Sequence, residues 1–305
     1  MSAAQAVPLR FQLGARTLLS VPRRLVRVGL SLEDALEGRV PALPALGAGD
    51  HGYLLTSVPA SRIGAARAAA PNCALHVRQS YMRYWADLSQ PYEAWLAGLS
   101  GNARAALRKK RKRFAEADGG AVDLREYRTP AELAEFHALA RGVSALTYQE
   151  RLLDAGLPED DAFRAEMAAR GAAGTVQAWL LFLKERPVAY LYCPAEGRTL
   201  IYDRLGHDPE LAELSPGTVL QAEAFARVMG AGNFDRFDFT EGEGQHKRQF
   251  ASGAVACADL LLLRRQAGNR VAMAALGGFD RAMAGAKQLA DRPVLRPLTR
   301  VLRRG

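Results

Sequence analysis

The chain has 305 residues, of which 49% are hydrophobic and 24% charged, and it carries a net charge of +9. This composition is that of a folded protein and excludes an intrinsically disordered one, and the length allows one large or two small domains. The positive charge is concentrated, because residues 101–113 hold seven Lys/Arg and no acid, and residues 264–305 hold ten against two acids. The rest of the chain is therefore acidic, which argues against a protein that binds nucleic acid over its whole surface.

Cysteine usage and the absence of long apolar segments bear on the compartment. The cysteines are odd in number, widely separated and without metal-ligand spacing; they are Cys73, Cys193 and Cys257. They predict a reducing compartment and no metal site. Arg10 and Arg16 interrupt the N-terminal apolar stretch, so no signal peptide is expected, and the longest apolar runs are far shorter than the ~20 residues that cross a bilayer. We predict a cytoplasmic protein, with peripheral contact at the inner membrane as an additional hypothesis.

Residues 1–94 are predicted to form a small β-rich lobe. Short apolar segments bounded by turn residues indicate its strands, and two Ala- and Leu-containing segments indicate helices. The predicted strands are 10–14, 17–21, 24–30, 53–58 and 74–85, and the predicted helices are 31–38 and 61–70.

Residues 95–264 are predicted to form a larger α+β domain, followed by a basic helical tail over residues 265–305. Ser100 is a suitable N-cap for a helix that ends near Asp118. Three antiparallel strands followed by a β-α-β crossover then predict a mixed sheet flanked by helices. The predicted elements are strand 121–127, helices 130–142 and 159–171, strands 175–183, 187–195 and 199–206, helix 216–230, strand 234–240, a helical turn at 244–251 and strand 254–263.

A first candidate site lies at the start of helix 216–230. Ser215 is expected to cap this helix, Pro216 suits its first turn, and Gly217 lets a ligand approach the backbone. Free amides of Ser215, Gly217 and Thr218 would then be able to hold a phosphate. The alternative is that this Ser-Pro pair only starts a helix.

A second candidate site follows strand 234–240. Asp238 is expected either to be paired within the molecule or to line a cleft as a substrate-binding residue. Beyond it, Glu241, His246 and Lys247 place a carboxylate, an imidazole and an ammonium in one segment. These groups suit proton transfer from an attacking amine and stabilisation of a developing oxyanion. A solvated turn with exposed charges is the alternative.

Three further residues are candidates on neighbouring elements. Tyr202, on strand 199–206, is a candidate proton donor, although core aromatic residues are the commoner outcome. Arg141 and Tyr148, between two predicted helices, form a polar cluster that would face an acceptor substrate, and a connecting loop is the alternative.

The ordered segments LSGNARAALRKKRKRF, PVAYLYCPAEGRTLIYDRLGHDPELAELSPGTVL and FDFTEGEGQHKRQFASG resemble a known family. They are similar to the GNAT-like acyltransferase domain of CelD-type cellulose-biosynthesis proteins, a relative of the Fem-type peptidyltransferases. The resemblance covers roughly residues 95–264, and it implies a GNAT-like fold. The lobe before residue 90 resembles a shortened first lobe of the two-lobed relatives.

The resemblance implies an N-acyltransferase that uses acetyl-CoA or another acyl-CoA and no metal. In such enzymes the helix after the fourth strand receives the donor pyrophosphate, here at Ser215–Thr218. The usual pyrophosphate loop, Gln/Arg-x-x-Gly-x-Gly/Ala, is absent from this sequence, which keeps an aminoacyl-tRNA donor open as the less favoured alternative. The implied acceptor is an amine or hydroxyl on a small molecule, saccharide or peptide, in envelope or exopolysaccharide metabolism.

The roles predicted on this basis are Glu241 as base with His246 as the alternative, Lys247 as the group that stabilises negative charge, and Tyr202 as the proton donor to the leaving thiolate. The basic segment 108–113 is expected to lie on a helix that packs through Ala103, Leu107 and Phe114. Its cations are then a solvated face, a phosphate contact, or a surface for tRNA or anionic lipid. A non-catalytic adaptor on membranes or polysaccharide machinery is the alternative from another functional class.

Overall fold

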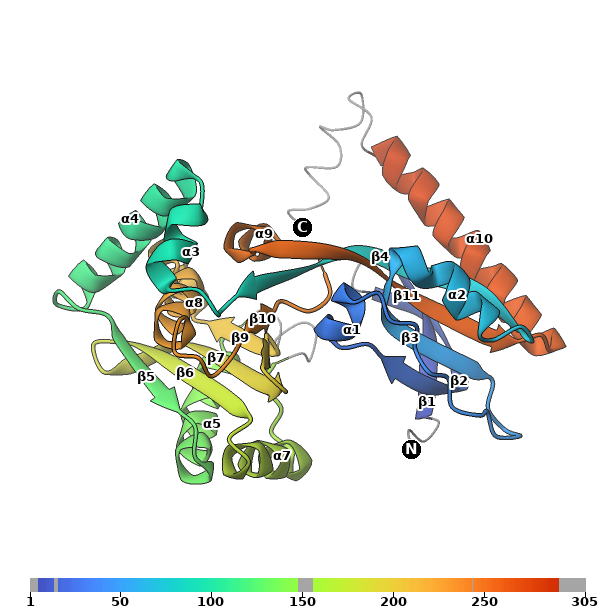
Figure 1. The fold of residues 1–305 in the computed structure, drawn as a ribbon, viewed down its shortest axis with the longest axis horizontal. Helices are drawn as coiled ribbons and strands as arrows, with labels where there is room; N and C mark the ends of the chain where they lie inside the picture. The colour runs from blue at the N-terminus through green and yellow to red at the C-terminus, as the bar shows by residue number, and fades with distance from the viewer. Residues whose placement is uncertain (1–4, 14–15, 148–155, 243, 291–305) are drawn as a thin grey trace. The chain divides into compact units, whose positions relative to one another are not determined.

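The computed structural model describes residues 5–13, 16–147, 156–242 and 244–290 (Figure 1). The chain divides into two compact units, one of residues 1–80 with 257–305 and the other of residues 81–256. Each unit has its own hydrophobic core.

These limits differ from the predicted domains 1–94, 95–264 and 265–305. The physical reason is that the last strand returns to the N-terminal strands, where Leu261 pairs with Leu54. The following helix was predicted as a separate tail, but its Leu276 packs in the core of the same unit.

The first unit contains one sheet with helices on both faces. Its strands are β1 (Gln5–Leu13), β2 (Arg16–Gly29), β3 (Gly52–Pro59), the first part of β4 (Cys73–Asp87) and the second part of β11 (Gly253–Arg264). Its helices are α1 (Leu32–Leu36), the 3-10 turn η1 (Ala60–Arg62), α2 (Ile63–Ala68) and α10 (Ala267–Ala290). β2 and β3 are parallel, whereas β1 with β2 and β3 with β11 are antiparallel.

The LLLL run of the sequence lies on β11, and its side chains point alternately to the two faces of this sheet. Leu260 and Leu262 pack in the cluster that includes α2, and Leu261 and Leu263 pack in the cluster that includes α10. A strand that is covered on both faces is continuously apolar, which explains the run without a membrane.

The second unit holds the larger α+β arrangement. Its strands are the second part of β4, β5 (Asp123–Tyr127), β6 (Val176–Leu183), β7 (Arg186–Glu196), β8 (Thr199–Ile201), β9 (Arg204–His207), β10 (Arg236–Asp238) and the first part of β11. Its helices are α3 (Tyr92–Gly98), α4 (Gly101–Ala117), α5 (Pro130–Ser144), α7 (Asp161–Ala172), the 3-10 turn η2 (Pro209–Leu214), α8 (Pro216–Val228) and α9 (Gln245–Phe250).

The sheet of this unit has the strand order β4-β10-β8-β7-β6-β5, with β9 also paired to β7. β10 and β8 are parallel, and the pairs β10–β4, β8–β7, β7–β6 and β6–β5 are antiparallel. This mixed sheet confirms the predicted fold class. The order of helices and strands from residue 100 onward also matches the prediction, except that the strand predicted at 199–206 is divided into β8 and β9.

Helices cover both faces of the second sheet, with α3, α4 and α8 on one side and α5 and α7 on the other (Figure 1). Trp179 and Phe225 belong to the core on the α8 side. Tyr190 and Tyr192, two residues apart on β7, both pack on the α5 side with Phe136. The face covered by α8 and the face covered by α5 therefore have different aromatic residues in their cores.

The structure contains N-terminal helix caps at positions where the sequence predicted helix starts. Ser100 accepts a hydrogen bond from the amide of Ala103 at 3.2 Å and starts α4. Thr129 and Glu132 form a capping box at the start of α5.

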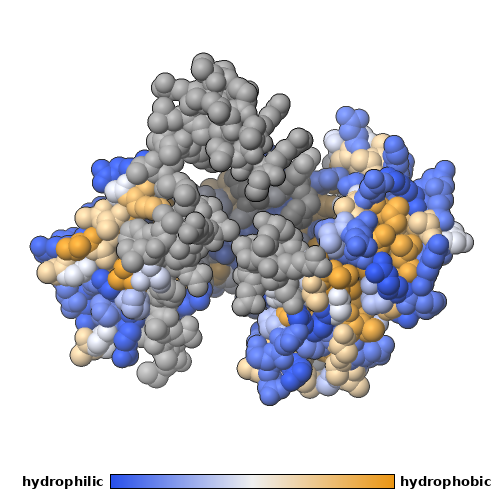
Figure 2. All heavy atoms as spheres, turned by 180° about the vertical axis from the view of Figure 1, so that it is seen from behind, coloured by the Kyte–Doolittle hydropathy of each residue, from blue (hydrophilic) through white to orange (hydrophobic). Residues whose placement is uncertain are grey.

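On the face shown in Figure 2, hydrophobic residues form small patches among hydrophilic ones. Within the described part of the chain, no helix has both the length and the apolar character to span a membrane.

Candidate active site

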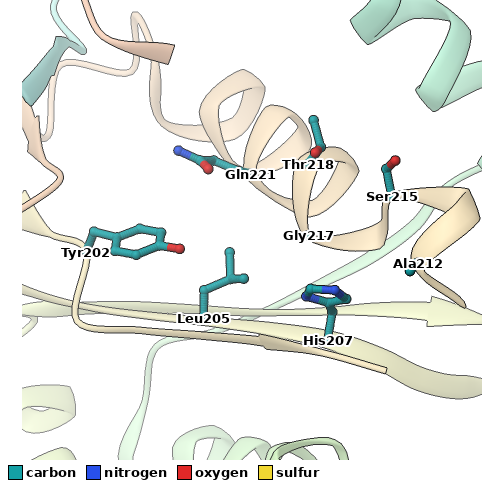
Figure 3. Close-up of a pocket in the computed structure, with 8 residues that line it drawn as sticks. All are labelled: Tyr202, Leu205, His207, Ala212, Ser215, Gly217, Thr218 and Gln221. Carbon is teal, nitrogen blue, oxygen red and sulfur yellow. The ribbon is translucent and has the colours of Figure 1, made fainter. Parts of the chain in front are cut away.

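A pocket of about 360 Å³ lies between the first turns of α8 and strand β9 (Figure 3). Its size is within the range of small-molecule sites. Hydroxyl, imidazole, carboxamide and phenol groups surround one leucine in its wall. The lining residues are Tyr202, Leu205, His207, Ala212, Ser215, Gly217, Thr218 and Gln221.

The strand predicted at 199–206 breaks beside this pocket. In β8, Leu200 pairs with Ala195 of β7, and in β9, Arg204 pairs with Tyr192 of the same strand. Residues 201–203 therefore lie opposite only two residues of β7, which is a β-bulge. Bulges bend a strand and re-aim its side chains, and they are common next to active sites.

The neighbouring strand separates from β9 at this bulge. β10 runs parallel to β8 as far as Asp238, and the amide of Tyr202 donates to the carbonyl oxygen of Asp238 at 2.8 Å. The next amide of that strand, from Phe239, donates to the carbonyl oxygen of Tyr84 instead. In the described part of the chain no strand pairs with the other edge of β9, so a gap between strands opens there. We call this place the strand gap.

The start of α8 differs in detail from the prediction. Ser215 occupies the N-cap position in the left-handed region (φ 53°), and its side chain makes no capping hydrogen bond. The amide of Ser215 donates to Ala212, and the amide of Thr218 donates to the carbonyl oxygen of Ser215. Of the three amides predicted to be free, only that of Gly217 lacks a backbone acceptor among the described residues. A non-glycine residue in this conformation costs about 1–2 kcal/mol, and such strain concentrates at functional sites.

Close packing brings the helix start onto β9. A Cβ atom on Gly217 would lie 3.3 Å from Leu205 Cδ2 and 3.5 Å from His207 Nδ1. The side of α8 that carries Gly217 thus approaches the imidazole, and burial lowers the pKa of His207. A neutral imidazole at neutral pH offers both a donor and an acceptor to a ligand.

The basic segment 108–113 lies on α4, and its cations have specific partners in the same unit. Arg111 pairs with Glu223 at 2.5 Å, and Arg113 with Glu213 at 3.0 Å. Lys110 Nζ donates to Thr218 Oγ1 at 3.3 Å, so one cation stands beside the wall of the pocket. Of the predicted packing stripe, Leu107 and Phe114 are buried, whereas Ala103 is only half-buried.

Two polar side chains, those of Tyr202 and Gln221, lie at the end of the pocket opposite Ser215 and His207 (Figure 3). Gln221 is 2% exposed, and its Nε2 has no hydrogen-bond partner among the described residues. Burial raises the pKa of Tyr202, which therefore keeps its hydroxyl hydrogen at neutral pH. The pocket thus has a cationic end at Lys110 and an inner end with neutral donors.

Asp238 does not line the pocket. Its carboxylate is 1% exposed and receives hydrogen bonds from Arg83 at 2.5 and 3.1 Å and from the amide of Thr240 at 2.8 Å. The structure therefore favours internal pairing over the predicted role in substrate binding, because a buried carboxylate needs these partners.

Glu241 and Lys247 also lie outside the pocket lining. Lys247 Nζ donates to the carbonyl oxygens of Phe239 and Glu241, at 2.7 and 2.6 Å. Burial lowers the pKa of this ammonium, while Asp238 and Glu241 oppose that shift. Through these two hydrogen bonds Lys247 stabilises the segment after β10. Its Nζ lies 5.9 Å from the ring centre of Tyr202. His246 lies on α9, and its side chain is outside the described residues.

Arg141 is placed far from these groups in the packing of the unit. It donates to the carbonyl oxygen of Leu157 at 2.5 Å and pairs with Glu159. These contacts fasten residues 157–159 to α5, so its observed role is structural. Tyr148, predicted as its neighbour in an acceptor site, lies outside the described residues.

A carboxylate that the sequence analysis did not select lies in the bulge. Asp203 follows Tyr202 and belongs to the opposite side of the sheet, where Arg204, Arg170 and Glu166 act on it electrostatically. Partial burial raises its pKa, and its contact to Arg204 Nε is long, at 3.7 Å. Alternation along the strand predicts that Asp203 and Tyr202 face opposite sides, but only the structure shows that the α7 residues Glu166 and Arg170 act on this carboxylate.

Gln221 was also missed, although a signal existed. It lies four residues after Gly217, so both occupy one face of α8. His207 was likewise not predicted, since it shares no spacing with other histidines or with cysteines. In the described part of the chain, no group of three or more His, Cys, Asp or Glu is arranged to hold a metal.

Residues 101–248 match the model of a family described as acetyltransferase (GNAT) domain. The chain therefore carries a GNAT acyltransferase domain. It lies within the second unit and includes the whole pocket.

Solved structures show the same fold. The crystal structure of FemX has a TM-score of 0.51 at 11% identity and covers 86% of this chain and 89% of its own. The C-terminal domain of a putative lysylphosphatidylglycerol synthetase from Agrobacterium fabrum has a TM-score of 0.51 at 11% identity, covering 74% of this chain and 72% of its own. No curated protein matches the sequence.

Proposed function

We propose that the protein is an N-acyltransferase that moves an acyl group from acetyl-CoA or another acyl-CoA to an amine or hydroxyl acceptor. The observation that carries this proposal is the pocket between α8 and β9. It joins the start of α8, where Gly217 lies and Lys110 of α4 adds a positive charge, to the strand gap bordered by Tyr202. An extended donor, with phosphates at one end and a reactive carbonyl at the other, would match the two ends of this pocket.

At the cationic end, the donor phosphates would contact the Gly217 amide, the hydroxyls of Ser215 and Thr218, and Lys110. Phosphates bind at helix N-termini because free amides and the helix dipole favour negative charge. Pairing within the loop uses two of the amides that such a site would employ. We propose that Lys110 replaces part of that contribution, since an ammonium makes a strong charge-assisted hydrogen bond to phosphate.

At the inner end, the acceptor amine would form a C–N bond to the acyl carbon as the C–S bond breaks. The amine proton passes to a carboxylate, and the leaving thiolate takes a proton from solvent. Tyr202 donates a hydrogen bond to the sulfur without losing its hydrogen, because its pKa is raised. This differs from the full proton transfer expected from sequence.

Two carboxylates compete for the role of base. Glu241 is exposed after β10, and Asp203 lies in the bulge with a raised pKa, which favours proton uptake. We propose Asp203, because it follows Tyr202 directly at the strand gap and would meet an acceptor that enters the gap from the α7 side of the sheet. Turnover by Asp203→Asn and Glu241→Gln, measured side by side, assigns the base to the variant with the larger loss in kcat.

The test of donor binding is a calorimetric titration with acetyl-CoA and with a longer acyl-CoA. We expect saturable binding that is lost in the double variant Ser215→Asp/Gly217→Asp, because two carboxylates would repel the phosphates. If the parent protein binds neither thioester, the CoA proposal is wrong. Charged tRNA is then the donor to titrate, and its binding would show steep salt dependence.

A further inference from the structure

Gln221 has no structural explanation within its own unit. It is 2% exposed on α8, and its Nε2 is buried without a hydrogen-bond partner among the described residues. Leaving a buried donor unsatisfied costs about 1–3 kcal/mol, and native proteins seldom keep such groups without a use.

A second glutamine provides a comparison. Gln177, on β6, is 6% exposed, and its Oε1 also lacks a partner among the described residues. Gln177 is not among the residues that line the pocket, whereas Gln221 lines it beside Tyr202. An unsatisfied amide thus points to a ligand only in the case of Gln221.

Figure 3 shows where a ligand atom would meet this amide. The carboxamide of Gln221 and the hydroxyl of Tyr202 lie at the same end of the pocket, with Leu205 between them and the His207 end. Two neutral donors at an inner end suit a carbonyl oxygen, and they do not suit a second phosphate or a purely apolar chain.

We propose that Gln221 is a donor-binding residue that hydrogen-bonds a carbonyl oxygen in the thioester arm of the acyl donor. The inference rests on the proposed function. It defines the ligand of the inner end as a chain that carries an amide or thioester carbonyl, held beside Tyr202 at the strand gap. The free-energy penalty of the unsatisfied Gln221 amide is offset only when the carbonyl of the bound donor accepts its hydrogen bond.

Gln221→Met separates this role from a structural one, because Met has a similar length and no amide. We expect an unchanged or higher melting temperature, since the variant removes an unsatisfied buried group. We expect the affinity for acetyl-CoA, measured by calorimetry, to fall by about tenfold, the usual worth of one good hydrogen bond. Gln177→Met is the matched control, with the same chemical change and no loss of affinity.

Two ligands, acetyl-CoA and S-ethyl-CoA, distinguish which carbonyl group of the donor Gln221 contacts. S-ethyl-CoA keeps the amides of the arm and lacks the acyl carbonyl. If Gln221→Met weakens acetyl-CoA alone, the acyl carbonyl is the partner, and if it weakens both, an arm amide is. Equal affinities of parent and variant for both ligands would overturn the inference, as would a drop in melting temperature with affinity retained.

A short fragment distinguishes failure of this inference from failure of the proposed function. S-acetyl-N-acetylcysteamine carries the thioester and one amide without any phosphate, and its binding is measured by NMR titration. If the parent protein binds this fragment but not CoA, and Gln221→Met loses the fragment, the CoA proposal fails and the inference stands. If the parent does not bind the fragment, the inference is wrong.

Discussion

Two buried polar regions of the same unit border the strand gap, and they differ in how their groups are paired. In the first, Arg83, Asp238, Thr240 and Lys247 bond to each other or to nearby carbonyl oxygens. In the second, around α8, Gln221 has a buried donor without a protein partner among the described residues. We call them the Asp238 cluster and the α8 pocket. The difference shows that residue type alone does not identify a binding group. A fully paired buried charge supports the fold, whereas an unpaired polar group in a cavity is available to a ligand.

The largest expected effect is on the Asp238 cluster. Asp238→Ala should lower the free energy of unfolding by about 3–5 kcal/mol, because Arg83 would keep a buried charge without its partner. Chemical denaturation measures this. The double variant Arg83→Met/Asp238→Leu should be clearly more stable than Asp238→Ala. A loss below about 1 kcal/mol in Asp238→Ala would mean that the cluster is not a structural pair.

Lys247→Met should lower the free energy of unfolding by about 1–2 kcal/mol, since it removes two charge-assisted hydrogen bonds to backbone oxygens at a half-buried site. The same denaturation experiment applies. If turnover falls far more than this stability change explains, Lys247 acts on negative charge in the reaction, as its sequence neighbourhood suggested.

In the α8 pocket, Lys110→Ala should weaken acetyl-CoA binding by about tenfold and make it less dependent on salt, because one ammonium contact to phosphate is lost. Calorimetry at two salt concentrations measures both effects. Lys109→Ala is the matched control, as Lys109 is the exposed neighbour on the same helix. Equal losses in the two variants would indicate only a general effect of positive charge.

The smallest expected effect on stability is that of Asp203→Asn. The folded-state pKa of Asp203 is raised, so the ionised carboxylate opposes folding once the pH exceeds that pKa. Glu166 contributes to this rise, whereas Arg170 and Arg204 oppose it.

The variant should therefore be more stable than the parent at neutral pH. The gain should stay below about 1 kcal/mol because the side chain is 36% exposed. The difference should shrink as the pH falls below the folded-state pKa of Asp203, and it should vanish near the unfolded-state pKa of about 4, where the carboxyl is protonated in both states. Thermal unfolding from pH 4 to 8 follows it, and a difference that does not change with pH would contradict the raised pKa.

Much of the fold was predictable because its signals are local. Ser100 and Thr129 cap helices through side chains only three residues from their partners, and such signals are present in the sequence itself. The mixed sheet of the second unit followed from the order of strands and helices. The division into units was not predictable, because it depends on the pairing of β11 with β3, about 200 residues apart in the chain.

The candidate site was predictable only in part. The sequence located the start of α8, since Ser-Pro-Gly is a local signal, and it singled out Tyr202 on the adjoining strand. It did not show that Lys247 bonds to backbone oxygens or that Asp238 is paired with Arg83, because the partners of a charge depend on distant packing.

The sequence by itself thus determined the elements, the fold class and one end of the pocket, where nearest neighbours in the chain set the backbone. Only the tertiary structure decided which polar side chains are satisfied by the protein and which are left for a ligand. A one-residue bulge brings Leu205 and His207 to the same side of the sheet as Tyr202, and helix packing buries the Nε2 of Gln221 without a hydrogen-bond partner among the described residues. Both result from register and packing between segments that the sequence does not place side by side.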